Sequence, residues 1–282
     1  MAMKEEVKDK VITLEPSRNL LCFNTFDEIN YLIINKYVEI VITKLKSFIS
    51  TDLLLDYKTT IEIRSNYENY SLRINTKLEP LSKIILHMFL EEEKCCYLEI
   101  NEYIHKNGLF KDILSLEYHP KSFRQPDDSI RNFIIEWFQK KISKDWDAIL
   151  FFGGECTMLG KILSGFSIFQ YFYTDFASIY YDIQKNYKNP KVKLIDYKKW
   201  KCDLTLSSSK HCCIINTGYK GMKENLAKEI CKIESLELYV ISCNLDSWEK
   251  DWYIIKEFYN LLEKIEILTN YSIWIYKLSR KL

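Results

Sequence analysis

Residues 147–173 read DAILFFGGECTMLGKILSGFSIFQYFY, and the pattern of this stretch decides the fold. Two apolar runs, 147–152 and 168–173, have the length and composition of buried strands. Between them a Gly-Gly pair precedes apolar residues at helical spacing over 157–164. A strand, a glycine turn, a helix and a second strand together form one repeating step of an α/β fold.

The same alternation continues toward the C-terminus. Further strands are expected at 192–196, 212–216 and 237–242, and helices at 176–186, 223–235 and 246–264. An amphipathic helix precedes the first strand, with an apolar face made of Ile130, Phe133, Ile134, Trp137 and Phe138. This alternation predicts a doubly wound, mainly parallel sheet. Since 265–270 and 272–278 leave no room for a helix between them, we expect them to add an antiparallel pair to that sheet.

The first half of the chain predicts a smaller α+β region. A helix is expected over 25–49 with Thr25 as its N-cap, and a hairpin over 60–64 and 70–74. Pro80 opens another expected helix, and 97–100 reads as a short strand. We therefore expect two domains: an α+β region at 1–119 that binds RNA or a partner, and an α/β domain at 120–282.

Composition limits the classes of function. The 282 residues carry 40 Lys+Arg against 39 Asp+Glu, so the net charge of +1 gives no global attraction to nucleic acid or membrane. No apolar run approaches the roughly 20 residues that span a bilayer, and the charged N-terminus does not resemble a signal peptide. Nine cysteines without a C-x-x-C box favour reduced thiols and no metal site, in an intracellular and most plausibly cytoplasmic compartment.

Three places in the α/β region attract attention because ligands bind at the carboxyl ends of parallel strands. The Gly153-Gly154 turn lets the backbone approach a ligand closely, although such a turn also serves simply to reverse the chain. Asp175 ends the second strand, where it either binds a ribose or caps the next helix. Cys243 follows the last parallel strand, where it acts either as a nucleophile or simply as a small buried apolar residue. The four histidines are scattered and form no relay with this cysteine.

The N-terminal half holds basic and aromatic side chains close together in sequence. Such a mixture favours RNA binding by charge and stacking, or else an ordinary solvated hairpin face. The residues concerned are Lys44, Lys46, Arg64, Arg73, Lys77, Tyr67 and Tyr70.

The order of several motifs carries a family resemblance. SFRQP at 122–126 leads into the amphipathic helix, GGECT follows the first strand, TDFAS the second, and CCIINTGYKGM and ISCN follow in turn. In this order they resemble the RNA uracil-5-methyltransferases, which make 5-methyluridine in tRNA and rRNA. The resemblance covers residues 120–278 and implies a Rossmann-like class I methyltransferase fold. Residues 1–119 show no visible match to that family's accessory RNA-binding domain.

The resemblance also implies roles for individual residues. The cofactor would be S-adenosylmethionine, with Gln125 contacting it, Asp175 holding its ribose, and Phe152, Gly153, Gly154 and Asn216 forming the pocket around it. Cys243 would attack C6 of uracil so that C5 becomes nucleophilic enough to take the methyl group. RNA, as tRNA or rRNA, would be the substrate. A base must remove the C5 proton, and Glu155 and Asp246 are candidates.

The chain also departs from the family pattern. Leu150 stands at the acidic position of the first strand, and Glu155-Cys156 replace small residues. The D-P-P-R segment has become NTGY at 216–219, Leu245 replaces a proline, and the loop that carries the family's base is missing between the last two strands. Three interpretations therefore remain: an active RNA uridine methyltransferase, a degenerate fold acting as a noncatalytic subunit or RNA- or protein-binding module, and a methyltransferase for another substrate with a structural Cys243.

Overall fold

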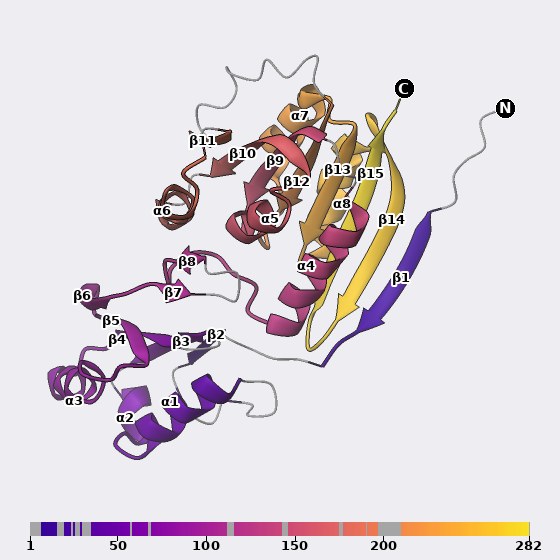
Figure 1. The fold of residues 1–282 in the computed structure, drawn as a ribbon. Coiled ribbons are helices and arrows are strands. Elements are labelled where there is room, and N and C mark those ends of the chain that lie inside the picture. The colour runs from indigo at the N-terminus through magenta and orange to yellow at the C-terminus, as the bar shows by residue number, and fades with distance from the viewer. Residues whose placement is uncertain are drawn as a thin grey trace. The chain divides into compact units, whose positions relative to one another are not determined.

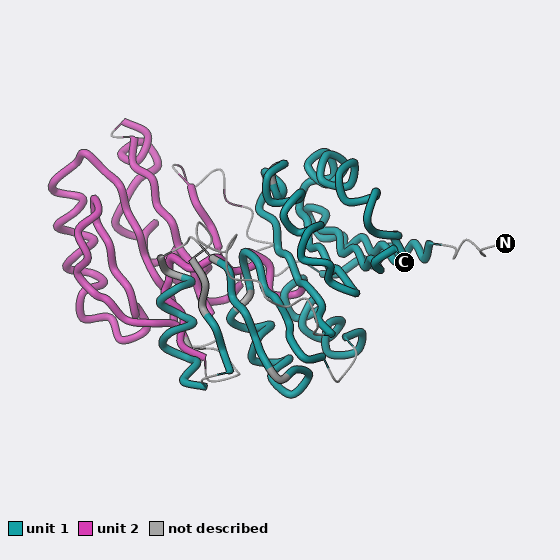
Figure 2. Tube along the Cα trace, turned by 90° about the horizontal axis from the view of Figure 1, so that it is seen from above, with its two compact units in different colours: residues 1–15, 130–282 teal, residues 16–129 magenta. Residues whose placement is uncertain are grey.

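The computed structural model describes residues 7–15, 20–23, 25, 29, 35–56, 58–66, 69–111, 116–142, 146–174, 177–189, 191–196 and 210–281. The chain forms two compact units, one made of residues 1–15 and 130–282 and the other of residues 16–129 (Figure 2). These limits differ from the expected boundary after residue 119, because an N-terminal strand joins the C-terminal sheet and the segment up to residue 129 belongs with the first half.

The larger unit is built on an eight-stranded sheet with the order β1-β14-β15-β13-β12-β9-β10-β11. The strands are β1 Lys8–Thr13, β9 Trp146–Gly153, β10 Ser167–Thr174, β11 Val192–Asp196, β12 His211–Asn216, β13 Glu237–Ser242, β14 Tyr259–Leu268 and β15 Ser272–Arg280. Only β15 runs against its neighbours, and the expected antiparallel pairing of the last two strands is confirmed. The chain reverses its direction of winding at β9, which lies between β10 and β12. This is the topological switch point of a doubly wound sheet.

Helices cover both faces of this sheet (Figure 1). They are α4 Asp128–Lys141, α5 Cys156–Ile162, α6 Ala177–Asn186, α7 Lys223–Ile233 and α8 Leu245–Ile255. One core joins α4, α5 and α6 to alternate strand residues such as Phe151 and Phe172, whose rings stack with centroids 4.9 Å apart. The opposite core joins α7 and α8 to the intervening residues, among them Phe152 and Tyr173. The near-continuous burial of β9 and β12 follows from this double cover.

Two expectations for this unit need correction. The helix predicted over 246–264 ends at Ile255, and β14 begins at Tyr259. From Tyr259 onward the side chains alternate between buried and accessible positions, which is the two-residue period of a strand. The strand β1 was not predicted, since it is mostly exposed and pairs in parallel with β14, some 250 positions away along the chain.

The smaller unit is a five-stranded mixed sheet with the order β2-β3-β4-β5-β6 and helices on one face. Its strands are β2 Leu20–Phe23, β3 Thr60–Ser65, β4 Tyr70–Asn75, β5 Cys95–Ile100 and β6 Tyr103–Asn107, and a short pair comprises β7 Phe110–Lys111 and β8 Glu117–Tyr118. The helices are α1 Lys36–Lys46, α2 Thr51–Asp56 and α3 Glu79–Phe89. The predicted hairpin is confirmed as β3 and β4.

The first helix of this unit begins later than its pattern suggested. The described helix starts at Lys36, and its N-cap is Asn35, whose Oδ1 accepts hydrogen bonds from the backbone N–H groups of Tyr37 and Val38 at 3.1 Å. Thr25 is therefore not its cap. Among the described residues no helix is long and apolar enough to cross a membrane.

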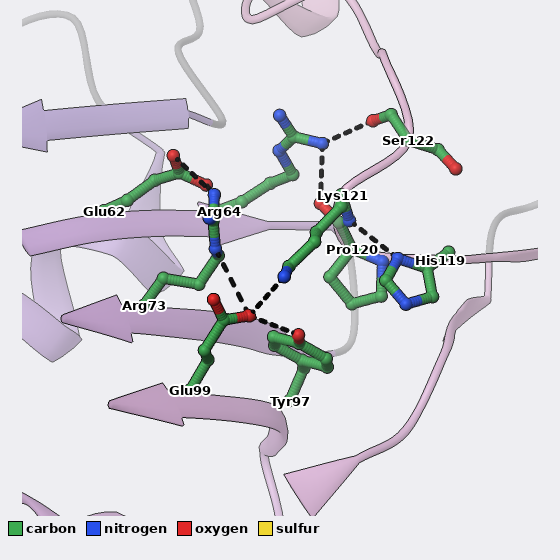
Figure 3. A network of polar contacts seen from close by, with 9 residues as sticks. All are labelled: Glu62, Arg64, Arg73, Tyr97, Glu99, His119, Pro120, Lys121 and Ser122. Atoms are coloured by element: carbon green, nitrogen blue, oxygen red, sulfur yellow. Dashed lines mark hydrogen bonds and ion pairs between the residues drawn. The ribbon is translucent and has the colours of Figure 1, made fainter. Parts of the chain in front are cut away.

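The sheet face opposite these helices carries a polar network (Figure 3). Glu99 binds the ammonium of Lys121 at 2.7 Å, accepts a hydrogen bond from the hydroxyl of Tyr97, and lies 3.6 Å from Arg73 Nε. Burial alone would raise the pKa of Glu99, but these donors and charges outweigh it and hold the pKa below its usual range. The network joins residues 119–122 to strands β3 and β5, and Arg73 of β4 contacts Glu99.

Candidate active site

The carboxyl ends of three neighbouring parallel strands meet at one edge of the large sheet. Gly153 ends β9 and is paired in register with Asn216, the last residue of β12, which is itself paired with Ile241 of β13. Cys243 follows two residues later. The structure thus brings the glycine turn, Asn216 and Cys243 to the switch-point edge, where the sequence placed them. Asp175 lies outside the described residues.

Gly153 allows the two central strand ends to approach closely. Its φ of +85° belongs to the left-handed region, and a Cβ atom built on it would lie 2.1 Å from the carbonyl oxygen of Asn216. A side chain at position 153 would therefore force β9 and β12 apart. Phe152 is buried beside it, with its ring stacked on Tyr173 at 4.3 Å.

Asn216 presents an unused donor at this edge. The residue is 5% exposed, and its Nδ2 atom is buried without a hydrogen-bond partner among the described residues. An unpaired buried amide N–H costs about 1–3 kcal/mol. A bound polar group that accepts this hydrogen bond would recover that free energy, so the donor suits a ligand site.

The glycine turn is followed by a buried ion pair. Glu155 adopts the left-handed conformation with φ of 58°, and its carboxylate lies 3.7 Å from Arg131 Nε of α4. Both side chains are 1% exposed. The ion pair fixes the turn to α4, and it withdraws Glu155 from the role of general base that the sequence left open. Asp246, the other candidate base, is exposed in the first turn of α8.

Cys243 is half-buried and packs against the core beneath α4. Burial raises the pKa of its thiol, while a backbone hydrogen bond offsets part of that rise. The thiol is therefore largely protonated at neutral pH, and a reaction through its thiolate needs a proton acceptor.

The loop that follows β12, residues 217–222, is anchored to the next strand and helix. The backbone N–H of Thr217 donates to the carbonyl of Ile241 at 3.0 Å. The carbonyl of Tyr219 accepts hydrogen bonds from Asn244 Nδ2 at 3.1 Å and Ser247 Oγ at 2.9 Å. These contacts join the loop directly to the residue that follows Cys243.

The far end of the same loop is hydrogen-bonded to Asp251. Asp251 Oδ2 accepts a hydrogen bond from the backbone N–H of Met222 at 2.9 Å, and burial raises the pKa of Asp251 to about 6. Gly221 has φ of +69°, and a Cβ there would lie 2.8 Å from that carboxylate. Sequence reasoning missed Asn244, Ser247 and Asp251 as loop anchors, although their spacing of three and four places them on one helix face.

Gln125 belongs to the smaller unit, just before α4, and is buried. Among the described residues no group of three or more His, Cys, Asp and Glu side chains could hold a metal ion. The cysteines whose side chains are described are free thiols.

Three of the basic and aromatic side chains expected at the surface of the N-terminal half make contacts within their own unit. Arg64 is 9% exposed and donates to the carbonyls of Pro120 and Ser122 at 2.7 and 2.5 Å (Figure 3). Arg73 is paired with Glu62, and Tyr70 is buried edge-on against Phe89. Arg64 and Tyr70 are therefore not available to stack on RNA, whereas Arg73 is partly exposed and Lys46 and Lys77 are exposed. Tyr67 lies outside the described residues.

Comparison with known proteins identifies the fold. No protein-family model and no curated protein matches the sequence. The structure is similar to that of Pyrococcus abyssi tRNA (uracil-54, C5)-methyltransferase in complex with S-adenosyl-L-homocysteine, with a TM-score of 0.67 and 14% identity over 95% of this chain and 78% of that one. It is also similar to P. horikoshii TYW2 in complex with MeSAdo, with a TM-score of 0.53 and 12% sequence identity over 86% of this chain and 98% of that one. The larger unit therefore has a Rossmann-like class I methyltransferase fold, and the first similarity reaches well into the smaller unit.

Proposed function

We propose that this chain is an S-adenosylmethionine-dependent methyltransferase that acts on C5 of uridine in RNA, with Cys243 as its nucleophile. The observation that supports it most is the meeting of Gly153, Asn216 and Cys243 at the switch-point edge of a methyltransferase sheet. The fold is shared with a tRNA (uracil-54, C5)-methyltransferase, which makes the same reaction the first candidate.

The residues at this edge suit the cofactor. Phe152, Gly153 and Gly154 would lie along its amino-acid part, because they lie at the end of β9, at the carboxyl edge of the sheet. Asn216 would donate its buried Nδ2 hydrogen to a cofactor acceptor. The roles that the resemblance implies for Gln125, in the other unit, and for Asp175, outside the described residues, stay predictions.

In this reaction the chain itself would form one covalent bond to the substrate, through Cys243. The thiolate of Cys243 adds to C6 of uracil, and the electron pair of the C5–C6 double bond becomes available at C5. When bound, S-adenosylmethionine would supply the methyl group that C5 takes, with S-adenosylhomocysteine as the leaving group. A base then removes the C5 proton, the C6–S bond breaks, and the double bond re-forms with the thiolate as leaving group. Asp246, exposed three residues after Cys243, is our candidate base.

Transfer of a labelled methyl group tests this proposal. The full chain is incubated with tRNA and rRNA that lack 5-methyluridine and with methyl-labelled S-adenosylmethionine, and the nucleosides are then separated. We expect label in 5-methyluridine with the wild type and none with Cys243→Ala. Label in another nucleoside, independent of Cys243, would instead support a methyltransferase with a different target atom.

A noncatalytic role is the second candidate. It is favoured by the raised pKa of Cys243 and by the short turn between β14 and β15, where a base-bearing loop is expected. In that case residues 16–129 or the sheet edge would bind RNA or a partner protein. The absence of S-adenosylmethionine binding at millimolar concentration would select this candidate.

A further inference from the structure

Tyr219 is an exposed aromatic residue on a fixed backbone. Its side chain is 72% exposed, whereas its carbonyl accepts two hydrogen bonds, from Asn244 Nδ2 and Ser247 Oγ. The rest of the loop is held by the turn hydrogen bond from Gly221 N–H to the carbonyl of Gly218, at 2.9 Å, and by the bond from Met222 to Asp251. The ring is thus carried on an ordered backbone.

The position of this ring is more informative than its exposure. Tyr219 lies three residues after Asn216, and one of its two hydrogen-bond donors is the residue that follows Cys243. Beside it Gly218 borders open space, since a Cβ built there would have no heavy atom within 4 Å. Lys220, the next residue, is exposed and carries a positive charge. A flat aromatic ring, open space and a cation therefore occur together on a loop that is hydrogen-bonded to the residue after the candidate nucleophile.

We propose that the Tyr219 ring is a stacking platform for a nucleobase of the RNA substrate next to Cys243, with Lys220 available to a backbone phosphate. Chemistry on a base requires that the base leave its stack, and proteins hold unstacked bases on aromatic side chains. A nucleobase fits better than an apolar protein segment, because the aromatic surface is a single ring flanked by a charged residue. This inference rests on the proposed function, because the platform is placed near Cys243 as the nucleophile.

Tyr253 provides a matched control. It is 71% exposed on α8, and the ammonium of Lys256 lies 4.3 Å from its ring centroid. It therefore also pairs an exposed ring with a cation. Nine residues of helix separate Tyr253 from the N-cap Asn244, about 13 Å along the axis.

The test measures binding of the full chain to a fluorescent oligouridine RNA by anisotropy. We expect Tyr219→Ala to weaken binding about 10-fold, Tyr219→Phe to stay within about 2-fold, and Tyr253→Ala to match the wild type. With an abasic RNA of the same length, wild type and Tyr219→Ala should bind equally, because no base remains to stack. Unchanged melting temperatures would confirm that the variants fold.

The platform would be overturned if Tyr219→Ala bound oligouridine as tightly as the wild type, or if it lost as much affinity for abasic RNA as for oligouridine. It would also be overturned if Tyr219→Phe lost as much affinity as Tyr219→Ala. The same conclusion would follow if the wild type bound no RNA but bound a protein through Tyr219. Trapping on 5-fluorouridine RNA separates this inference from the proposed function. If Cys243 is trapped while Tyr219→Ala binds normally, only the platform fails. If no trapping occurs while Tyr219→Ala loses affinity for oligouridine alone, the platform stands and the uridine-C5 reaction fails.

Discussion

The carboxylate of Glu155 and the guanidinium of Arg131 form an ion pair at 3.7 Å, and each side chain is 1% exposed. This pair fixes the glycine turn to α4. Breaking a buried ion pair by the removal of one partner costs about 3–5 kcal/mol, whereas an apolar replacement of both partners is often neutral.

Glu155→Gln should therefore lower the free energy of unfolding by about 3 kcal/mol. The double variant Arg131→Met, Glu155→Leu should recover most of that loss, because no charge is left buried. Chemical denaturation of Arg131→Met, of Glu155→Leu and of the double variant gives the coupling energy. Additive losses would show that the pair does not hold the turn.

Gly153→Ala should destabilise the chain by at least about 2 kcal/mol, since φ of +85° strains any other residue and the added Cβ would meet the carbonyl of Asn216. Gly165→Ala is the matched control, because a Cβ there would have no heavy atom within 4 Å. Thermal melts of both variants compare the two sites. Equal effects would mean that the approach of β9 to β12 is not tight.

Asn216→Leu should separate stability from ligand binding. The substitution removes a buried N–H without a partner, so the free protein should be no less stable than the wild type. Affinity for S-adenosylmethionine should fall about 10-fold in calorimetry, and a given cofactor concentration should raise the melting temperature less than it does in the wild type. Undiminished affinity would remove Asn216 from the cofactor site.

The stability of the protein should depend on pH through Asp251. Burial raises its pKa to about 6, so between about pH 4 and pH 6 the folded state binds more protons than the unfolded state. Stability due to this group is therefore complete below pH 4 and is lost as the pH rises through 6, by about 2 kcal/mol at most. Asp251→Asn keeps an acceptor for Met222 N–H and should flatten this part of the curve. A curve that matches that of the wild type would contradict the assignment.

Much of the larger unit follows from local sequence. The strands 192–196 and 237–242 are found where the apolar runs predict them, because buried strands and amphipathic helices leave distinct periods. The strand β1 could not be predicted, since its pairing with β14 depends on residues at the other end of the chain. The end of α8 was misplaced because Tyr259 onward remains apolar while the period changes.

In the candidate site, the residues at strand ends could be predicted from the sequence, but the side-chain pairings could not. Cys243 and Asn216 could be placed at one edge because parallel strands end together. The pairing of Arg131 with Glu155 could not, because it depends on where α4 crosses the turn, and glutamate gives no signal for a left-handed conformation. Arg64 was misassigned for a related reason: the carbonyls that bind it lie 56 and 58 positions away.

The central claim, that Cys243 attacks C6 of uridine in RNA, is tested most directly by covalent trapping. The full chain is incubated with S-adenosylmethionine and RNA containing 5-fluorouridine, and adducts are resolved by denaturing electrophoresis. Because fluorine cannot leave as a proton does, the methylated adduct should persist with the wild type and be absent with Cys243→Ser. Its rate of formation should rise with pH, since burial raises the pKa of the thiol. An adduct formed equally well by Cys243→Ser, or no adduct with a wild type that binds both RNA and cofactor, would contradict the claim.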